Sequence, residues 1–138
     1  MSWDAYVNAH VVGSTLDKAF LVDVTGAALW AKSTGAEISP DEMKSIANAF
    51  NDASGVREAG IFLSGNKYFF TQLDDVKDEK SLPGRSIPVL HAAKGKQGVV
   101  AAKCTSGIII AHYPEGVVSG DAIDATVRHA VHLIKNNV

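Results

Sequence analysis

The sequence is short of cysteine, of net charge and of long apolar runs, and each shortage excludes a class of protein. Cys104 is the single cysteine, so no disulfide can form within the chain and a metal site built from cysteines is not expected. A formal charge of −2 offers no basic field for nucleic acid. No apolar run approaches the roughly 20 residues of a membrane-spanning helix, and the N-terminus lacks the basic and apolar regions of a signal peptide. The sequence therefore predicts a small cytoplasmic protein without a metal or other cofactor.

What is present is the composition of one globular domain. The chain is 46% hydrophobic and 20% charged, which is typical of folded rather than disordered proteins. Its 138 residues suffice for a single ordinary core. We therefore expect one domain over residues 1–138.

The opening stretch, MSWDAYVNAH, predicts a helix with aromatic side chains at a position where helix ends are usually solvated. Ser2 can cap a helix that runs to about Val12. At about 100° per residue, Trp3 and Tyr6 share one side of that helix, and small alanines lie on the opposite side. We expect the alanines to face the core and the two aromatic rings to be exposed, where a ligand can cover them.

Two further helices have clear start signals. In SPDEMKSIANAF, Ser39 and Glu42 form a capping box and Pro40 takes the first helical position. In SGDAIDATVRHAVHLIKNNV, Ser119 can cap a final helix with an apolar stripe along one side. His132 falls off that stripe, on a side that meets solvent or a partner.

Three stretches read as β-hairpins, because two apolar runs flank a turn rich in Gly, Ser, Thr or Asn. They are KAFLVDVTGAALWAKS, GIFLSGNKYFFTQL and GVVAAKCTSGIIIAHY, with turns at 25–26, 64–66 and 105–107. The segment Asp74–Lys96 is charged and holds two of the four prolines, and its pattern leaves open whether it is ordered. A short helix over Asp74–Lys80 is one reading of it.

The element order predicts the fold class. Helix, hairpin, helix, two hairpins and helix indicate an α+β fold with a central antiparallel sheet of six to seven strands. We expect the N- and C-terminal helices to pack on one face of the sheet and the middle helix to pack on the other.

At this point the sequence resembles the profilin family. The resemblance rests on SWDAYV at the N-terminus, LWA on the second strand, GNKYFF on the fourth, and IIIAHYPEGVVSGDA leading into the last helix. It spans nearly the whole chain. The segment Asp74–Lys96 is the exception, since it is longer than in compact members, and we expect an insertion there. The resemblance implies a protein that binds monomeric actin and regulates actin polymerisation at the cytoskeleton.

The resemblance also implies binding of proline-rich segments, such as those of formin-type assembly factors, in a groove between the two terminal helices. It assigns this role to Trp3, Tyr6, Trp30, His132, Leu133 and Val138. Val138 departs from the family pattern, which usually ends in Tyr, so one ring is missing from the groove. The alternatives are that the three large rings are ordinary core residues and that His132 is an ordinary exposed histidine.

For actin, the resemblance points to one side of the sheet and to the start of the last helix. The matching residues are Val56, Lys67, Gln72, Lys103, Val117, Gly120, Asp124 and Arg128. Three of them depart from the family pattern: Gln72 stands where a basic residue is common, Asp124 where Lys is frequent, and Arg128 where an acid often lies. Because charge swaps across an interface are costly unless the partner changes too, we expect weaker or partner-specific actin binding.

Two further expectations follow from the resemblance. Family members bind phosphoinositides through basic patches, and Lys94, Lys96 and Lys103 are the candidates here, although 13 basic residues against 15 acidic ones provide no strong field. Since Asp74–Lys96 follows a strand of the expected actin side, we hypothesise that it folds over or beside that surface. A tolerated surface insertion is the alternative.

Other functions find little support. His129 and His132 have a spacing that can hold a metal, but no third ligand is indicated. Cys104 lacks an evident histidine partner for nucleophilic chemistry, and the sequence contains no phosphate-binding loop or dinucleotide motif. We therefore expect a binding protein and not an enzyme. The remaining alternative is a longin or sensor-like scaffold that serves trafficking or small-ligand binding.

Overall fold

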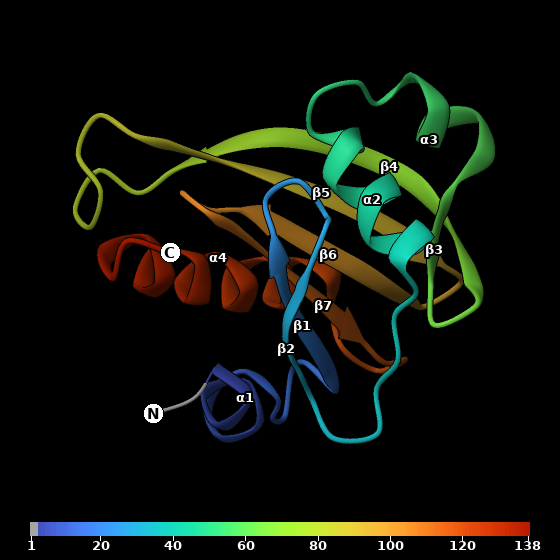
Figure 1. The fold of residues 1–138 in the computed structure, drawn as a ribbon, viewed down its shortest axis with the longest axis horizontal. Coiled ribbons are helices and arrows are strands. Elements are labelled where there is room, and N and C mark those ends of the chain that lie inside the picture. Colours follow the sequence, from blue (N-terminus) through green and yellow to red (C-terminus); the bar gives the residue numbers. More distant parts are fainter. Residues whose placement is uncertain (1–2) are drawn as a thin grey trace.

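The computed structural model describes residues 3–138, except for the side chain of His10. In these residues a seven-stranded antiparallel sheet has the order β2-β1-β7-β6-β5-β4-β3 (Figure 1). The strands are β1 (Lys18–Asp23), β2 (Leu29–Lys32), β3 (Ile61–Leu63), β4 (Asn66–Lys77), β5 (Ser86–Lys94), β6 (Gln97–Lys103) and β7 (Gly107–Tyr113). The helices are α1 (Trp3–Tyr6), the π-helix η1 (Val7–Val11), α2 (Pro40–Ala49), α3 (Ser54–Ala59) and α4 (Ser119–Lys135).

The sheet separates two hydrophobic cores, as the sequence predicts. On one face Leu21 and Ile109 pack with side chains of α1, η1 and α4. On the other face Phe20 and Ile110 pack with α2 and α3. Every residue of β7 is buried because both faces of this central strand are covered. The predicted placement of the terminal helices on one face and the middle helix on the other is confirmed.

The predicted capping box at the start of α2 is present and extends further than expected. Ser39 Oγ accepts a hydrogen bond from the backbone N–H of Glu42 at 3.1 Å, and Glu42 Oε1 accepts one from the N–H of Ser39 at 2.9 Å. The Glu42 carboxylate also accepts the N–H groups of Ser64 and Gly65, at 3.2 and 2.8 Å. One buried acid thus caps the helix and holds the β3–β4 turn.

The reading of Asp74–Lys80 as a short helix is wrong. The chain continues as strand β4 to Lys77 and returns as β5 from Ser86, so that 78–85 alone form the connecting turn. In this paired region Val76 and Ile87 are register partners, and both pack on the core that includes α4. Pairing with a central strand outweighs the weak helical tendency of a charged stretch.

The N-terminal helix buries the side that was expected to be exposed. Tyr6, Val7 and Val11 are 5%, 1% and 5% exposed, whereas Ala5 and Ala9 face solvent. Burying a large ring or a valine removes more apolar surface from water than burying an alanine does, so the core takes these residues. The predicted Ser2 cap lies outside the described residues.

Helix α3 has no counterpart in the sequence prediction. It is six residues long, and its N-cap residue Ala53 makes no side-chain capping bond, so the usual start signal is missing. Within the described part of the chain, none of the helices combines the length and the apolar character that a membrane crossing requires.

Candidate functional site

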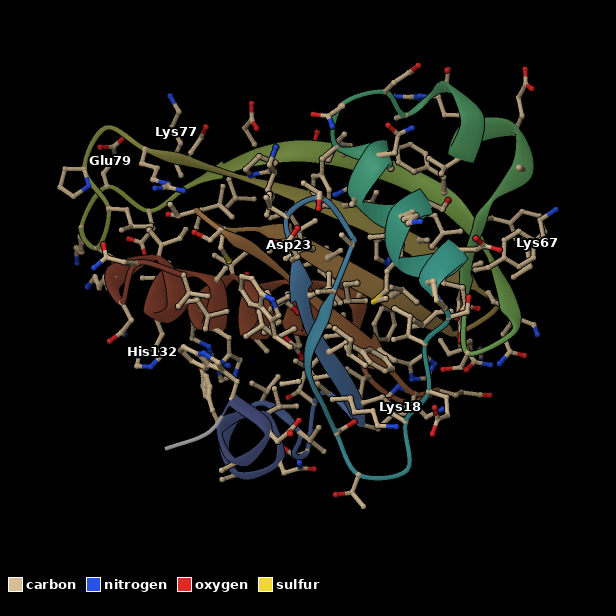
Figure 2. The ribbon with its side chains drawn as sticks, in the orientation of Figure 1. Lys18, Asp23, Lys67, Lys77, Glu79 and His132 are labelled. Carbon is tan, nitrogen blue, oxygen red and sulfur yellow. The ribbon has the colours of Figure 1, made fainter. Side chains whose placement is uncertain are left out.

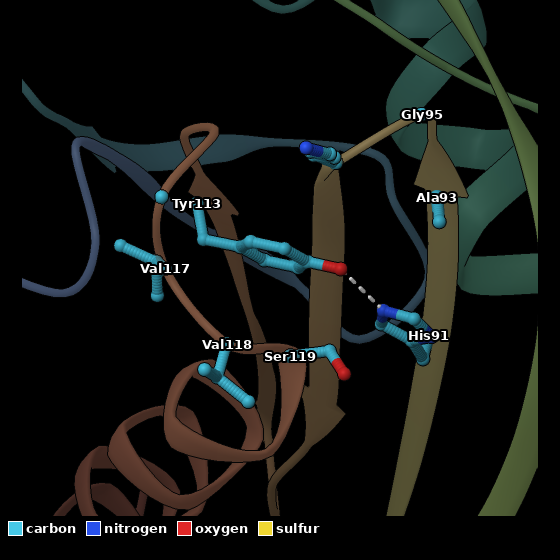
Figure 3. A pocket seen from close by; sticks show the side chains of 9 residues that line it. His91, Ala93, Gly95, Tyr113, Val117, Val118 and Ser119 are labelled. Atoms are coloured by element: carbon cyan, nitrogen blue, oxygen red, sulfur yellow. Dashed lines mark hydrogen bonds between the residues drawn. The ribbon is translucent and has the colours of Figure 1, made fainter.

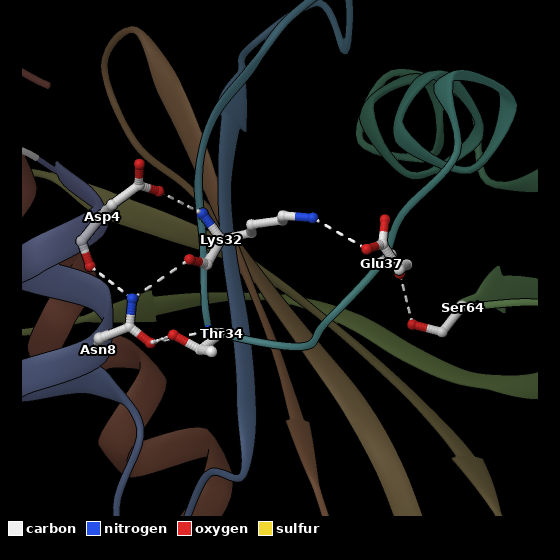
Figure 4. Close-up of polar contacts among 6 residues, drawn as sticks. All are labelled: Asp4, Asn8, Lys32, Thr34, Glu37 and Ser64. Atoms are coloured by element: carbon white, nitrogen blue, oxygen red, sulfur yellow. Dashed lines mark hydrogen bonds and ion pairs between the residues drawn. The ribbon is translucent and has the colours of Figure 1, made fainter.

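Helix α1 and η1 are attached to the edge strand β2 by polar side chains. Asp4 Oδ1 accepts the backbone N–H of Lys32 at 3.0 Å, and Asn8 Oδ1 accepts that of Thr34 at 2.8 Å (Figure 4). Asn8 Nδ2 donates back to the carbonyl oxygen of Asp4 at 2.9 Å. An edge strand has unpaired backbone groups, and these two side chains pair some of them. The first helical turn is thereby placed beside the strand that carries Trp30.

Tyr6 is the centre of a ring cluster between α1 and α4. Its ring centroid lies 5.7 Å from that of Trp3 and 5.2 Å from that of His132. Its hydroxyl is hydrogen-bonded to Nδ1 of His129 at 2.8 Å. Figure 2 shows His132 in the space between the two terminal helices. Burial raises the pKa of Tyr6 to about 12, with a smaller contribution from Cys104, so its hydroxyl keeps its proton at neutral pH.

Trp30 and Val138 are both placed by the β6–β7 turn. A Cβ added at Gly107 would lie 2.9 Å from Cζ3 of Trp30, so the indole rests directly on this glycine. The N–H of Gly107 donates to the carbonyl oxygen of Val138 at 3.0 Å, and the N–H of Val138 donates to that of Leu133 at 2.9 Å. The turn thus brings the indole close to the end of the C-terminal segment.

The six residues assigned to proline-rich segments differ in exposure. Trp30 is 36% exposed, His132 is exposed, and Trp3 and Val138 are half-buried. Tyr6 and Leu133 are buried, at 5% and 1% exposure. The expectation that Tyr6 is exposed is therefore wrong, because its ring lies under Trp3 and His132 and against α4. Leu133 belongs to the core beneath the cluster.

The residues assigned to actin are spread over several elements. Lys67 and Gln72 are exposed on β4, whereas Val56 on α3 is 6% exposed. Gly120, Asp124 and Arg128 are exposed on α4, and Val117 lies half-buried just before it. Lys103, half-buried, is at the end of β6 away from Val117, since Tyr113 and the residues that follow it lie at the Gly98 end.

A hollow of about 400 Å³ lies between β5 and the start of α4 (Figure 3). Its walls include Val117 and Val118, and His91 and Tyr113 line it as well. The His91 Nε2 atom is 2.7 Å from the Tyr113 hydroxyl, and its Nδ1 atom is 2.5 Å from Oγ1 of Thr71. Burial lowers the pKa of His91. These hydrogen bonds link side chains of β4, β5 and β7. The sequence alone did not predict them.

Exposed apolar side chains lie near the 400 Å³ hollow, on the same face of the sheet. Phe69 on β4 is 63% exposed, with the ammonium of Lys67 5.3 Å from its ring centroid, and Val118 is 66% exposed. Large exposed apolar side chains beside basic ones are typical of protein–protein contact surfaces. The GNKYFF motif contained the signal for Phe69, because alternation along a strand places Lys67 and Phe69 on one face and Tyr68 on the other.

A second and larger hollow, of about 810 Å³, lies between the β4–β5 tip and the outer side of α4. Lys77 and Glu79 line it from the tip, and Asp124 and Arg128 line it from the helix. In Figure 2, Lys67 and Lys77 mark the two ends of β4. The Asp74–Lys96 hairpin therefore lies beside two of the residues assigned to actin.

Comparisons with known proteins agree with this arrangement. The sequence model of the Profilin family matches residues 1–138. Profilin of Schizosaccharomyces pombe is 32% identical over 135 residues, which are 97% of each chain. Acanthamoeba castellanii profilin II has a TM-score of 0.84 at 29% identity, covering 99% of this chain and 100% of its own. Mouse profilin IIa shares the fold, with a TM-score of 0.69 at 18% identity over the full length of both chains. The longin-like alternative is thereby set aside, and the chain belongs to the profilin family.

Proposed function

We propose that this protein binds actin monomers and proline-rich segments of partner proteins, and so regulates actin polymerisation in the cytoplasm. The observation that carries the proposal is family membership over the whole chain, together with the ring cluster between α1 and α4. The mouse profilin IIa structure is a complex with a double repeat from the FH1 domain of mDia1. That protein therefore binds an FH1-domain repeat on the same fold.

The ring cluster suits a polyproline II helix. Such a helix is already stiff, so docking it costs little conformational entropy. Indole rings can pack on pyrrolidine rings while their N–H groups donate to the ligand's carbonyl oxygens. Trp3 and His132 of the cluster have exposed surface, and so does Trp30 on β2, so we assign direct contact to these three residues. Tyr6 lies against the rings of Trp3 and His132, and Leu133 belongs to the core on this face of the sheet.

For actin, we propose the face that carries Lys67, Phe69 and the hollow lined by Val117. Its apolar and basic side chains fit an acidic partner surface that also offers apolar contacts. Asp124 and Arg128 carry charges opposite to those that the family usually has at these positions. Both line the hollow beside the β4–β5 tip. We propose that this tip modifies the actin contact. Replacing 78–85 by a two-residue turn should change the affinity for actin, and an unchanged affinity would rule this out.

The lysines expected to bind phosphoinositides lie at the two ends of β6. Lys94 and Lys96 lie at the β5–β6 turn, whereas Lys103 is at the opposite end of β6. Strands rise by about 3.3 Å per residue, so six residues put Lys103 roughly 20 Å from the turn. The three lysines therefore do not make one compact patch for a lipid headgroup.

Two assays test the proposal. A proline decamer should change the fluorescence of the two tryptophans in a saturable titration, and Trp3→Ala should abolish the binding while the circular dichroism spectrum is retained. Excess protein should slow the spontaneous assembly of pyrene-labelled actin. No fluorescence change and no effect on assembly would refute the proposal.

A further inference from the structure

His129 is hydrogen-bonded to the ring cluster through Tyr6. It is not among the six residues assigned to the binding of proline-rich segments. Its Nδ1 atom lies 2.8 Å from the Tyr6 hydroxyl, which links α4 to α1 across 123 positions of sequence. Its ring centroid is 5.9 Å from that of Tyr6, with the rings at 66°. His129 comes one helical turn before His132, so both histidines lie on the side of α4 that faces Tyr6.

The position of the Tyr6 ring determines where its two neighbours lie. Trp3 meets it edge-on, with 63° between the ring planes, and His132 lies against it at 49°. Trp3 and His132 are proposed to contact the ligand, and both rest on Tyr6. A group that fixes the Tyr6 ring therefore also fixes the spacing of two contact residues. A polyproline II ligand has a fixed repeat, so its affinity depends on this spacing.

The Tyr6 hydroxyl is better placed to hold the ring than to meet a ligand. The residue is 5% exposed, and its hydroxyl is directed at His129. Because burial raises the pKa of Tyr6 to about 12, the group stays a phenol that can both donate and accept. It can donate to a bare Nδ1 or accept from a protonated one, so the contact survives either state of the imidazole.

We propose that His129 is a positioning residue for proline-rich ligands, acting through the Tyr6 hydroxyl. The proposal rests on the proposed binding of proline-rich segments. It assigns the recognition of the ligand to Trp3, Trp30 and His132. It assigns the orientation of Trp3 and His132 to the hydrogen bond between the buried Tyr6 and the half-buried His129. A lost hydrogen bond of this kind changes an equilibrium by about threefold to tenfold.

The test is a titration of the full chain and of five variants with a proline decamer. Binding is measured by the change in tryptophan fluorescence. His129→Leu and Tyr6→Phe should each weaken binding by about threefold to tenfold. The double variant should be no weaker than either single one, since both remove the same bond. His129→Asn should recover most of the affinity, because its amide places a polar atom near the position of Nδ1. Lys44→Leu, at an exposed site on α2 on the other face of the sheet, is the control for adding a leucine and should bind normally.

The outcomes separate this inference from the proposed function. Additive losses in the double variant, an Asn variant as weak as the Leu variant, or full affinity in His129→Leu would each overturn the positioning role and leave ligand binding intact. No binding by the unaltered chain would overturn both. If His129→Leu does not fold, as judged by circular dichroism, Tyr6→Phe still decides, since it removes one hydroxyl and keeps the ring. Unchanged affinity in Tyr6→Phe would then refute the role.

Discussion

The carboxylate of Asp4 accepts the backbone N–H of Lys32 at 3.0 Å, and this contact ties the first helical turn to the edge strand of the sheet. Asp4→Ala removes the acceptor, so we expect the α1 segment to detach more easily and proline-decamer affinity to fall. A loss of about 1 kcal/mol, or roughly fivefold, is typical of one such hydrogen bond. Asp4→Asn keeps an acceptor oxygen and should bind as the unaltered chain does. Equal affinities for the Ala and Asn variants would contradict this role.

Gly107 lies under the indole of Trp30, and an alanine there has no room. Its Cβ would be 2.9 Å from Cζ3 of Trp30 and 3.1 Å from the carbonyl oxygen of Val22. Gly107→Ala should therefore displace the ring, weaken decamer binding at least severalfold, and shift tryptophan emission before any peptide is added. Gly13→Ala is the control, because its Cβ meets no atom of the described residues within 4 Å. The prediction fails if both variants behave alike.

His91 should make stability depend on pH. Burial lowers its pKa in the folded chain, so below the usual histidine pKa of about 6.5 the unfolded chain binds a proton more readily than the folded one. Its contribution is fully present above that pH and is lost as the pH falls through the lowered value. The thermal midpoint should fall from pH 7 to pH 5, and less steeply in His91→Gln. Identical slopes for the two proteins would refute this assignment.

Phe69 should anchor the contact with actin. It is 63% exposed, more than Phe62 at 42% or Trp30 at 36%, and exposed aromatic residues often dominate binding energy. Phe69→Ser should weaken the effect on pyrene-actin assembly by about tenfold, equivalent to a loss of about 1.4 kcal/mol, with little change in folding stability. Leu29→Ser, at the opposite edge of the sheet and 37% exposed, should leave the effect unchanged. If the Phe69→Ser variant affects actin assembly as strongly as the unaltered chain does, Phe69 is not part of the contact.

Several features of this protein were decided by residues close together in the chain. The capping box of Ser39 and Glu42, the proline at the first position of α2 and the glycines of the hairpin turns act over a few positions. Their geometry is local, so their sequence pattern is sufficient to predict them. The apolar runs around the turns likewise predicted the antiparallel sheet, and helical spacing of apolar residues predicted the stripe of α4. Family resemblance, carried by short motifs at the right spacing, supplied the candidate binding residues.

Other features depended on tertiary contacts between elements that are far apart in the chain. Whether α1 buries Tyr6 or Ala5 cannot be decided from helical spacing, because both sides are compatible with a core and the neighbouring α4 selects the larger ring. Asp74–Lys77 became part of strand β4 because β5 pairs with it. The contacts of Asp4 with Lys32, His129 with Tyr6 and His91 with Tyr113 join residues far apart in the chain. Such contacts exist after folding has brought the partners together, so no local pattern records them.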